Sequence, residues 1–388
     1  MRQNCFRYRM DMEQLSASEA ITLFLCGDVM TGRGVDQILP CPSDPTLHEP
    51  YVQSAVEYVA MAEQANGSIR KPVSPSYIWG DALDELDRIA PAVRIVNLET
   101  SVTTSNAYEH KGINYRMHPA NTPCLTAAKI DCCVLANNHV LDWGRPGLDD
   151  TTRTLREAGI KTVGAGRDLK EAWEPAVIGV SARSRVLVFA AGTADSGVEL
   201  DWAAGESASG VAFLRELSEK TAAWITRRVQ SAKRPGDIAV FSIHWGGNWG
   251  YHVPGEHQAF ARKLIDLGMI DVVYGHSSHH PKGIEVYKNR PILYGCGDFL
   301  NDYEGIGGYE EFRSHLVLAY FVTVDARTGS LSRLEMAPFQ IKRFRLQNAS
   351  AEDAAWLRNV MAREARPAGV QVNVDARNHL ILSWPASR

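Results

Sequence analysis

The feature that most constrains the fold is a set of five apolar segments of strand length, each followed closely by polar side chains. The segments are residues 21–26, 93–97, 131–136, 238–243 and 272–274. The side chains that follow them are Asp28, Glu99, Asn138, His139, His244 and His276. In an open α/β sheet the carboxyl ends of the strands meet at one edge, and ligands bind there. We therefore expect these side chains to converge on one site.

The rest of the chain continues the alternation of strands and helices that is typical of a layered α/β fold. Further strands are expected at 186–191, 291–294, 316–324, 331–338 and 380–383, and helices at 147–158 and 351–364. We divide the chain into an N-terminal extension (1–20), one domain (21–345) and a C-terminal extension packed on that domain (346–388). An insertion at 40–80, with a helix expected at 51–65, is interpreted as a candidate lid.

Composition excludes several classes of protein. The 41 basic and 45 acidic residues give a net charge of −4, which argues against binding nucleic acid through its phosphates. No segment approaches the roughly 18 apolar residues of a membrane helix, and the first 20 residues lack the apolar region of a secretory signal. Cys132 and Cys133 lie in an apolar segment, as expected of buried thiols in a reducing compartment. We expect a cytoplasmic protein that binds neither nucleic acid nor membrane.

Each polar strand end also has a purely structural interpretation. Asp28 could cap the turn after Gly27, and Glu99 could be a helix-capping or surface residue. His244 could be a hydrogen-bonded core histidine, and Asp142 could cap the helix that follows it. Repetition at five strand ends favours a divalent cation instead, because strand ends are rigid anchors for its ligands.

Six longer segments carry a resemblance to a known family. They are GDVMTGRG (27–34), NLETSVT (97–103), ANNHVLDWGRPGL (136–148), HWGGNW (244–249), QAFARKLIDLGMIDVVYGHSSHHPKGIE (258–285) and PILYGCGDFLNDYEG (291–305). The chain resembles the CapA (poly-γ-glutamate capsule protein) branch of the calcineurin-like metallophosphoesterase superfamily over about residues 20–340. The resemblance implies a four-layer αββα sandwich with two mixed sheets. It also implies that a metal is surrounded by Asp28, Glu99, Asn138, His244 and His276, with His139 beside it as an acid or base.

Three motifs depart from the metallophosphoesterase pattern. Asp28 is not followed by the histidine of Asp-x-His, Glu99 replaces an aspartate pair, and His276-Ser-Ser-His279 differs in spacing from His-x-His. A two-metal clamp on a phosphoryl group needs the full ligand set. We therefore expect one hard divalent cation (Ca²⁺, Mg²⁺ or Mn²⁺, with Zn²⁺ as a further candidate) and no organic cofactor.

Two histidine–aspartate pairs are expected beside that cation, His139 with Asp142 and His279 with Asp298. An aspartate fixes the tautomer of a histidine and strengthens it as a base. CapA-like proteins without export signals occur as peptide epimerases in lasso-peptide gene clusters, and the chain is similar to them in length and site pattern. The main hypothesis is therefore a metal-dependent, pyridoxal-phosphate-independent epimerase. It would invert the C-terminal residue of a precursor peptide, with tryptophan as a candidate residue.

The alternative is a CapA-like hydrolase or ligase of amide bonds in poly-γ-glutamate or another glutamyl peptide. A metallophosphoesterase and a non-catalytic peptide-binding module are further alternatives. The aromatic residues near the expected site could hold an aromatic peptide end or simply pack; they are Trp143, Trp245, Trp249, Tyr251 and Tyr303. The cations that could bind a peptide carboxylate are Arg33, Lys111, Arg116 and Arg145. The oligomeric state is not predicted.

Overall fold

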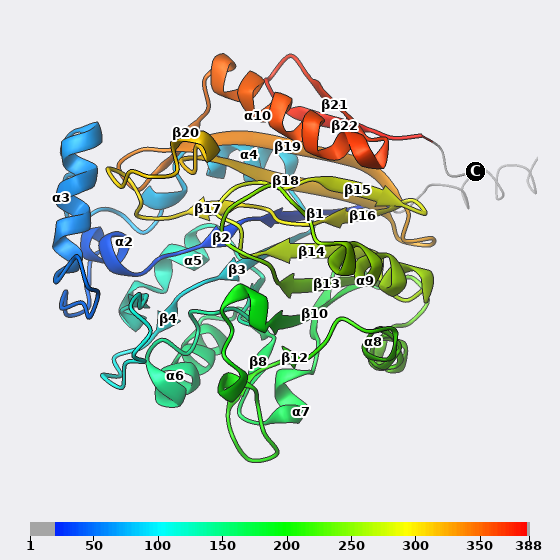
Figure 1. The fold of residues 1–388 in the computed structure, drawn as a ribbon, viewed down its shortest axis with the longest axis horizontal. Coiled ribbons are helices and arrows are strands. Elements are labelled where there is room, and N and C mark those ends of the chain that lie inside the picture. Colours follow the sequence, from blue (N-terminus) through cyan, green and yellow to red (C-terminus); the bar gives the residue numbers. More distant parts are fainter. Residues whose placement is uncertain (1–19, 386–388) are drawn as a thin grey trace, which may run out of the picture.

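The computed structural model describes residues 20–385 as an α/β sandwich of two mixed sheets with helices outside them (Figure 1). The larger sheet has the order β17 (Asp298–Leu300), β2 (Asp28–Val29), β3 (Val93–Leu98), β1 (Ala20–Cys26), β18 (Leu316–Asp325), β19 (Leu331–Ile341), β22 (Leu380–Ser383) and β21 (Gln371–Val374). Beside this path, β6 (Cys132–Val134) pairs with β3 and with β7 (Lys161–Val163), and β20 (Leu346–Asn348) pairs with β19. The strands from β17 to β1, with β6 and β7, run parallel, and β18 onward run antiparallel.

The smaller sheet has the order β12 (Phe213–Leu214), β10 (Arg185–Thr193), β13 (Ile238–His244), β14 (Val272–His276), β16 (Arg290–Leu293) and β15 (Ile284–Tyr287), with β9 (Ala176–Gly179) on β10. Its central strands are parallel, and β9 and β15 are antiparallel to their neighbours. The helices are α2 (Arg33–Ile38), α3 (Ala55–Asn66), α4 (Ala82–Ile89), α5 (Pro123–Ala127), α6 (Gly144–Glu157), α7 (Leu169–Ala172), α8 (Glu219–Ala232), α9 (Gly255–Asp266) and α10 (Ala351–Ala365).

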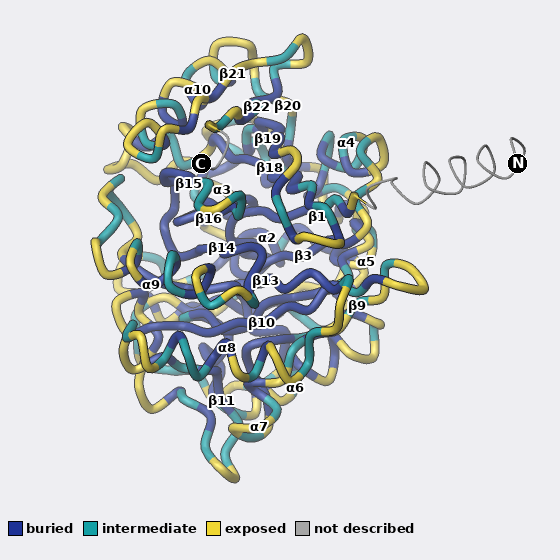
Figure 2. The backbone as a smooth tube through the Cα atoms, turned by 90° about the vertical axis from the view of Figure 1, so that its right-hand side faces the viewer, coloured by how far each residue is buried: buried dark blue, intermediate teal, exposed yellow. Residues whose placement is uncertain are grey.

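Strands β3, β10 and β13 are buried along nearly their whole length, because both faces of the sheets are covered there. In β1, Phe24 and Cys26 pack toward the helices outside the larger sheet, whereas Leu23 and Leu25 pack between the two sheets. Side chains of α8 and α9 cover the outer face of the smaller sheet. Figure 2 shows the buried strands as a dark-blue centre with the exposed positions around it. The predicted fold class, a four-layer sandwich with two mixed sheets, is confirmed.

The insertion at 40–80 is anchored to the body of the protein. Its helix α3 starts at Ala55, later than expected, because Ser54 and Glu57 form a capping box there. Val59 and Ala62 join the core outside the larger sheet. The buried Trp79 donates a hydrogen bond from Nε1 to the Cys124 carbonyl at 2.7 Å. The lid assigned to this insertion stays a prediction.

The C-terminal segment continues the larger sheet. Strand β22 pairs with β19, and Leu357 and Met361 of α10 pack into the core between the sheets. Figure 1 shows α10, β21 and β22 together at one side of the molecule. Apart from Ala20, the predicted N-terminal extension lies outside the described residues. No helix within residues 20–385 is long and apolar enough to cross a membrane. Cys132 and Cys133 are free and buried, as expected.

Candidate metal centre

The polar strand ends lie together because neighbouring strands share a register. Parallel strands β13 and β14 place His244 opposite His276. In the larger sheet, Asp28 pairs with Asn97 on one side and with Asp298 on the other. The packing of the two sheets then brings these edges into contact, and His276 Nδ1 lies 3.0 Å from Asp28 Oδ1. The site therefore draws its residues from both sheets.

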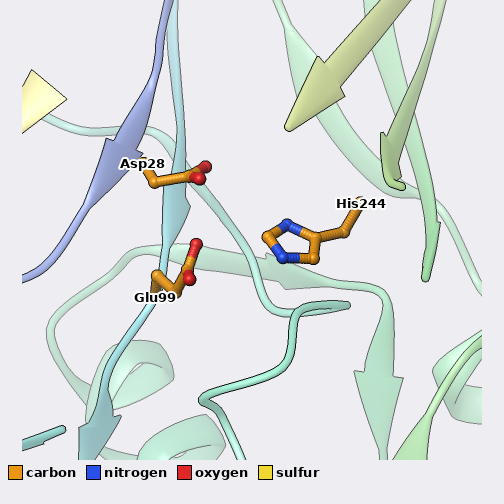
Figure 3. Close-up of side chains that lie close together, drawn as sticks. All are labelled: Asp28, Glu99 and His244. Carbon is orange, nitrogen blue, oxygen red and sulfur yellow. The ribbon is translucent and has the colours of Figure 1, made fainter. Parts of the chain in front are cut away.

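Three of the five predicted ligands form a tight group, the donor cluster, made of Asp28, Glu99 and His244. Each offers one nitrogen or oxygen atom, and these atoms lie within 4.8 Å of one another. All three side chains are buried. Figure 3 shows both carboxylates pointing toward the His244 ring, which enters from the opposite side. The surface position considered for Glu99 is therefore wrong.

The other two predicted ligands contact the donor cluster directly. Asn138 Oδ1 lies 3.1 Å from His244 Nε2, and His276 Nδ1 pairs with Asp28. The second ring nitrogen of each histidine, Nδ1 of His244 and Nε2 of His276, is buried without a hydrogen-bond partner among the described residues. A buried nitrogen without a partner is costly unless something else binds its lone pair.

The charges of the donor cluster also favour a cation. Burial lowers the pKa of His244 to about 3, so its imidazole is neutral and has a free lone pair at neutral pH. Burial alone would raise the pKa of Asp28, but the hydrogen bond and charge of His276 hold it well below its ordinary value. Burial and then the Asp28 charge raise the pKa of Glu99 well above its ordinary value. Two buried carboxylates this close need a shared proton or a cation.

The residues present fit a divalent cation, because carboxylates, an amide oxygen and imidazole nitrogens converge there. Asp28 does not cap the turn after Gly27. It accepts hydrogen bonds from Asn97 Nδ2 and from the Ser277 backbone N–H. The structure therefore uses its carboxylate to join β2, β3 and the loop after β14.

The first predicted histidine–aspartate pair is formed. His139 Nδ1 lies 2.7 Å from Asp142 Oδ2, and His139 Nε2 lies 3.8 Å from Glu99 Oε1 in the donor cluster. Asp142 also accepts from Lys111 Nζ at 2.8 Å and from the Tyr115 backbone N–H at 2.6 Å. Its alternative role as a helix cap is wrong, because α6 begins at Gly144 without a side-chain cap. Burial, helped by the Lys111 charge, lowers the pKa of His139 to about 4 despite Asp142.

The second pair is formed as well. His279 Nδ1 lies 2.9 Å from Asp298 Oδ1, and Asp298 also accepts from Asn301 Nδ2 at 2.8 Å. Burial opposes a charge on His279, but the charge and hydrogen bond of Asp298 raise its pKa above the ordinary value. The two pairs therefore differ, since their surroundings lower the pKa of His139 and raise the pKa of His279.

Two tyrosines lie between these pairs. The Tyr115 and His139 rings meet edge-on with their centroids 4.6 Å apart, and the Tyr303 and His279 rings meet edge-on with their centroids 5.4 Å apart. Their hydroxyl oxygens are 3.0 Å apart. The Arg33 guanidinium lies over the Tyr115 ring at 4.5 Å. A hydrogen-bonded aromatic bridge thus connects the surroundings of the two histidines.

The four cations considered for a peptide carboxylate all have protein partners. Arg33 is buried and pairs with Asp302 and Glu49. Lys111 pairs with Asp142, and Arg145 donates to the Asp201 carbonyl. Arg116 donates to the carbonyls of Ser105 and Asp44 and to Asn106. Arg33 has an organising role that spacing along the chain did not reveal, because its partner Asp302 is 269 residues away.

The aromatic residues divide into two groups. Trp143 and Trp245 are buried and pack against Arg116 and His257. Trp249 and Tyr303 line a cavity that reaches His279. Tyr251 packs against His280 and lies outside that lining. The packing interpretation therefore holds for Trp143, Trp245 and Tyr251.

Sequence reasoning missed two asparagines that hold the site together. Asn97 donates to Asp28 Oδ1 at 2.8 Å and to Glu99 Oε2 at 3.2 Å. Asn137 donates to Asn97 Oδ1 at 3.0 Å, and its own Oδ1 accepts from the His139 backbone N–H. The signal for Asn97 was present, because an amide inside a buried apolar strand needs polar partners.

The fold and the donor cluster define a two-sheet α/β protein with a candidate divalent-metal centre. Residues 22–303 match the model of the family described as bacterial capsule synthesis protein PGA_cap. The chain belongs to this family. The predicted membership of the CapA branch is thereby confirmed.

Several relatives carry related names. The chain is 48% identical over 371 residues to a probable polyglutamine synthesis accessory protein of Mycobacterium tuberculosis, covering 95% of this chain and 97% of the relative. It is 23% identical to the capsule biosynthesis protein CapA of Bacillus anthracis, covering 84% and 68%. It is 26% identical to the PGA biosynthesis protein CapA of Bacillus subtilis, covering 63% and 60%. A phosphatase from Mycoplasma pneumoniae superposes with a TM-score of 0.46 and 12% identity, covering 83% and 94%.

These names agree better with the alternative hypothesis, CapA-like chemistry on a glutamyl substrate, than with peptide epimerisation. The lasso-peptide connection and the precursor-peptide substrate find no support in them.

Proposed function

We propose that this protein is a metal-dependent enzyme that cleaves or transfers amide bonds of a glutamyl polymer during its synthesis. The observation that carries the proposal is the pair of buried imidazole nitrogens that have no partner among the described residues, together with two nearby carboxylates and two histidine–aspartate pairs. The names of the relatives support the choice of a polymer of glutamate or its amide as the substrate class.

We assign Asp28, Glu99, His244 and His276 as the residues that would hold the cation, with Asn138 as a further ligand or as the residue that orients His244. Ca²⁺, Mg²⁺, Mn²⁺ and Zn²⁺ are all compatible with this mixture of oxygen and nitrogen donors. A divalent cation, when bound, supplies positive charge that polarises a carbonyl oxygen. Asn97 holds both carboxylates in place through its amide group.

His139 is suited to accept a proton. Its Nδ1–H donates to Asp142, so the lone pair is on Nε2, which faces the donor cluster. Its lowered pKa keeps the ring neutral at physiological pH. In the proposed reaction, Nε2 takes a proton from the attacking water or amine as the nucleophile adds to the amide carbonyl carbon.

His279 is suited to give a proton. Asp298 holds the ring through Nδ1 and raises its pKa, which favours the protonated ring that can donate. In the proposed reaction this proton goes to the amide nitrogen as the carbon–nitrogen bond breaks. The proton gained by His139 and the proton lost by His279 then exchange with solvent, which restores both rings.

The decisive experiment follows the amide bond and the Cα proton together. We expect the metal-loaded protein to convert synthetic γ-glutamyl or glutaminyl oligomers into products of changed length, measured by mass spectrometry, and to stop after chelation. In D₂O, deuterium at Cα without a change of chain length would instead identify an epimerase. One histidine with a lowered pKa and one with a raised pKa would also suit that reaction. Rapid turnover of an aryl phosphate would identify a phosphoesterase.

A further inference from the structure

A cavity of about 840 Å³ is lined in part by His279. Most of its lining comes from three segments: the 40–80 insertion, the loop at Gly112 and Ile113, and the loop at 301–315. Trp249 and its neighbour Asn248, and Lys342 and its neighbour Ile341, complete it together with Arg33 and His279. Because His279 belongs to one of the two proton-transfer pairs, a chain bound in this cavity would reach the candidate metal centre. We call it the substrate groove.

The wall of the substrate groove carries an unusual concentration of exposed apolar side chains. Tyr51, Ile113, Ile306 and Tyr309 line it, with exposed fractions of 92%, 45%, 48% and 49%. Tyr309 also stacks on Trp249 at 4.0 Å, which extends the apolar surface toward His279. Apolar side chains gathered around a concave site indicate a ligand with an aliphatic part.

Of the arginine and lysine side chains that line the groove, two are paired with carboxylates and one has no such partner among the described residues. Arg33 pairs with Glu49, and Arg313 pairs with Asp353 at 3.3 Å. The Glu310 carboxylate, at the exposed rim, accepts from the Gly308 backbone N–H at 2.8 Å. Lys342 makes no ion pair and no side-chain hydrogen bond within the described part of the chain. The groove therefore presents one ammonium group that has no counter-ion.

Lys342 is held in this position by the turn that it begins. Its backbone N–H donates to the Arg345 carbonyl, and Arg343 and Phe344 between them have φ of 58° and 53°, a conformation that side chains disfavour. The Glu304 carboxylate accepts both of their N–H groups at 2.6 Å, and it also accepts from Asn66. Glu304 lines the groove, but its oxygens are occupied in fixing this turn. Its carboxylate is therefore a poor counter-ion for Lys342.

We propose that the substrate groove binds an extended glutamyl chain, with a free carboxylate of the chain paired to Lys342 and its methylene groups against the apolar wall. A glutamyl polymer alternates these two features, so it matches both the apolar side chains and the unpaired ammonium group. In a glutaminyl polymer the carboxylate is an amide, which has no charge to pair with lysine. Lys342 thus selects the acidic form. This inference rests on the proposed function, because it names the substrate of the same site.

The test measures equilibrium binding of two labelled peptides to the full chain by fluorescence anisotropy. One peptide is a γ-glutamate hexamer, and the other is the same hexamer with each free carboxyl group amidated. We expect wild type to prefer the acidic hexamer. Lys342→Gln should weaken binding of the acidic hexamer about tenfold, as loss of one charge-assisted contact does, and leave the amidated hexamer unchanged. Lys342→Glu should weaken it further. The matched control is Lys170→Gln, on the exposed surface of α7 outside the groove.

Each result decides between the two proposals. Equal binding of both hexamers, no binding of either, or a Lys342→Gln variant that binds as wild type does would overturn the role of Lys342. If the protein turns over the polymer but Lys342→Gln binds the acidic hexamer as wild type does, the proposed function stands and the groove assignment is wrong. Binding that depends on Lys342, without turnover of any oligomer, would support the groove and contradict the proposed function. Melting temperatures of the variants should equal that of wild type, since Lys342 has no side-chain partner to lose.

Discussion

His276 Nδ1 lies 3.0 Å from Asp28 Oδ1, and this contact joins the two sheets at the candidate metal centre. It leaves Nε2 of His276 buried without a partner among the described residues. Nδ1 is thus engaged by a carboxylate while the second nitrogen is free, which is the arrangement that typically orients a metal-binding histidine.

Metal content should depend on Glu99. In Glu99→Gln a buried carboxylate of the donor cluster becomes a neutral amide of the same shape. We expect the affinity for a divalent cation to fall by at least tenfold, because even residues behind the ligands contribute about 10–100-fold. Inductively coupled plasma mass spectrometry after dialysis measures it. The control is Glu174→Gln on the exposed surface, and equal metal content in both variants would argue against the centre.

The turnover rate should depend on Asp142. In Asp142→Asn the partner that holds His139 Nδ1–H in place becomes an amide, and Nε2 no longer presents its lone pair reliably. We expect a loss of kcat of about a hundredfold or more, the size typical of a positioned acid or base, with a change in the pH profile. Steady-state kinetics on a glutamyl oligomer measures both. Asp149→Asn, exposed on α6, is the control, and an unaltered pH profile in Asp142→Asn would count against His139 as the base.

Stability should depend on the Asp302 carboxylate. It accepts two hydrogen bonds from the buried Arg33 and one from the Gly34 backbone N–H. Asp302→Asn leaves the guanidinium with Glu49 as its one remaining carboxylate, so we expect the free energy of unfolding to fall by about 3–5 kcal/mol. Urea denaturation measures it. Asp353→Asn breaks the more exposed pair with Arg313 and should change stability by about 1 kcal/mol or less.

Acid should remove a contribution that Glu335 makes to stability. The hydrogen bond from His379, opposed by burial, and then the contact with Arg333 lower the pKa of Glu335 from 4.5 to about 2. Because the folded pKa is the lower one, this contribution is complete above pH 4.5 and disappears as the pH falls toward 2. The stability difference between wild type and Glu335→Gln, followed by urea unfolding, should therefore shrink from pH 6 to pH 2. A stability difference that stayed constant over this pH range would contradict the lowered pKa of Glu335.

Local patterns were sufficient to predict most of the strands and the position of the site. Segment 238–243 was expected as a strand that ends at His244, and β13 ends there. The reason is physical: a strand buried on both faces is a continuous apolar run, and the first polar residue after it marks its end. The helix at 351–364 was similarly close to α10, whose start is fixed by the Ser350 cap. By contrast, α8 and α9 were not predicted, although Ser218 caps the start of α8.

What could not be predicted depends on contacts between distant segments. The role of Asp142 could not be decided from the sequence, because a helix follows it. Its role is fixed by contacts with Lys111 and Tyr115, which lie about thirty residues earlier in the chain. Arg33 was one of four cations considered for a substrate carboxylate, because nothing near it in the chain suggested Asp302. Of the predicted ligands, Asn138 and His276 contact the donor cluster without belonging to its tight group, and only the packing of the two sheets determines that.

The position of the donor cluster at the junction of the sheets has a thermodynamic consequence. Asp28 and Glu99 belong to the larger sheet and the segment after it, whereas His244 ends a strand of the smaller sheet. A cation held by all three acts as a cross-link between the halves of the core. The unfolded chain lacks this arrangement, so loading with metal must raise the melting temperature, in proportion to the logarithm of free metal once the site is saturated. Metal supply would then govern how long the protein persists, as well as whether it reacts.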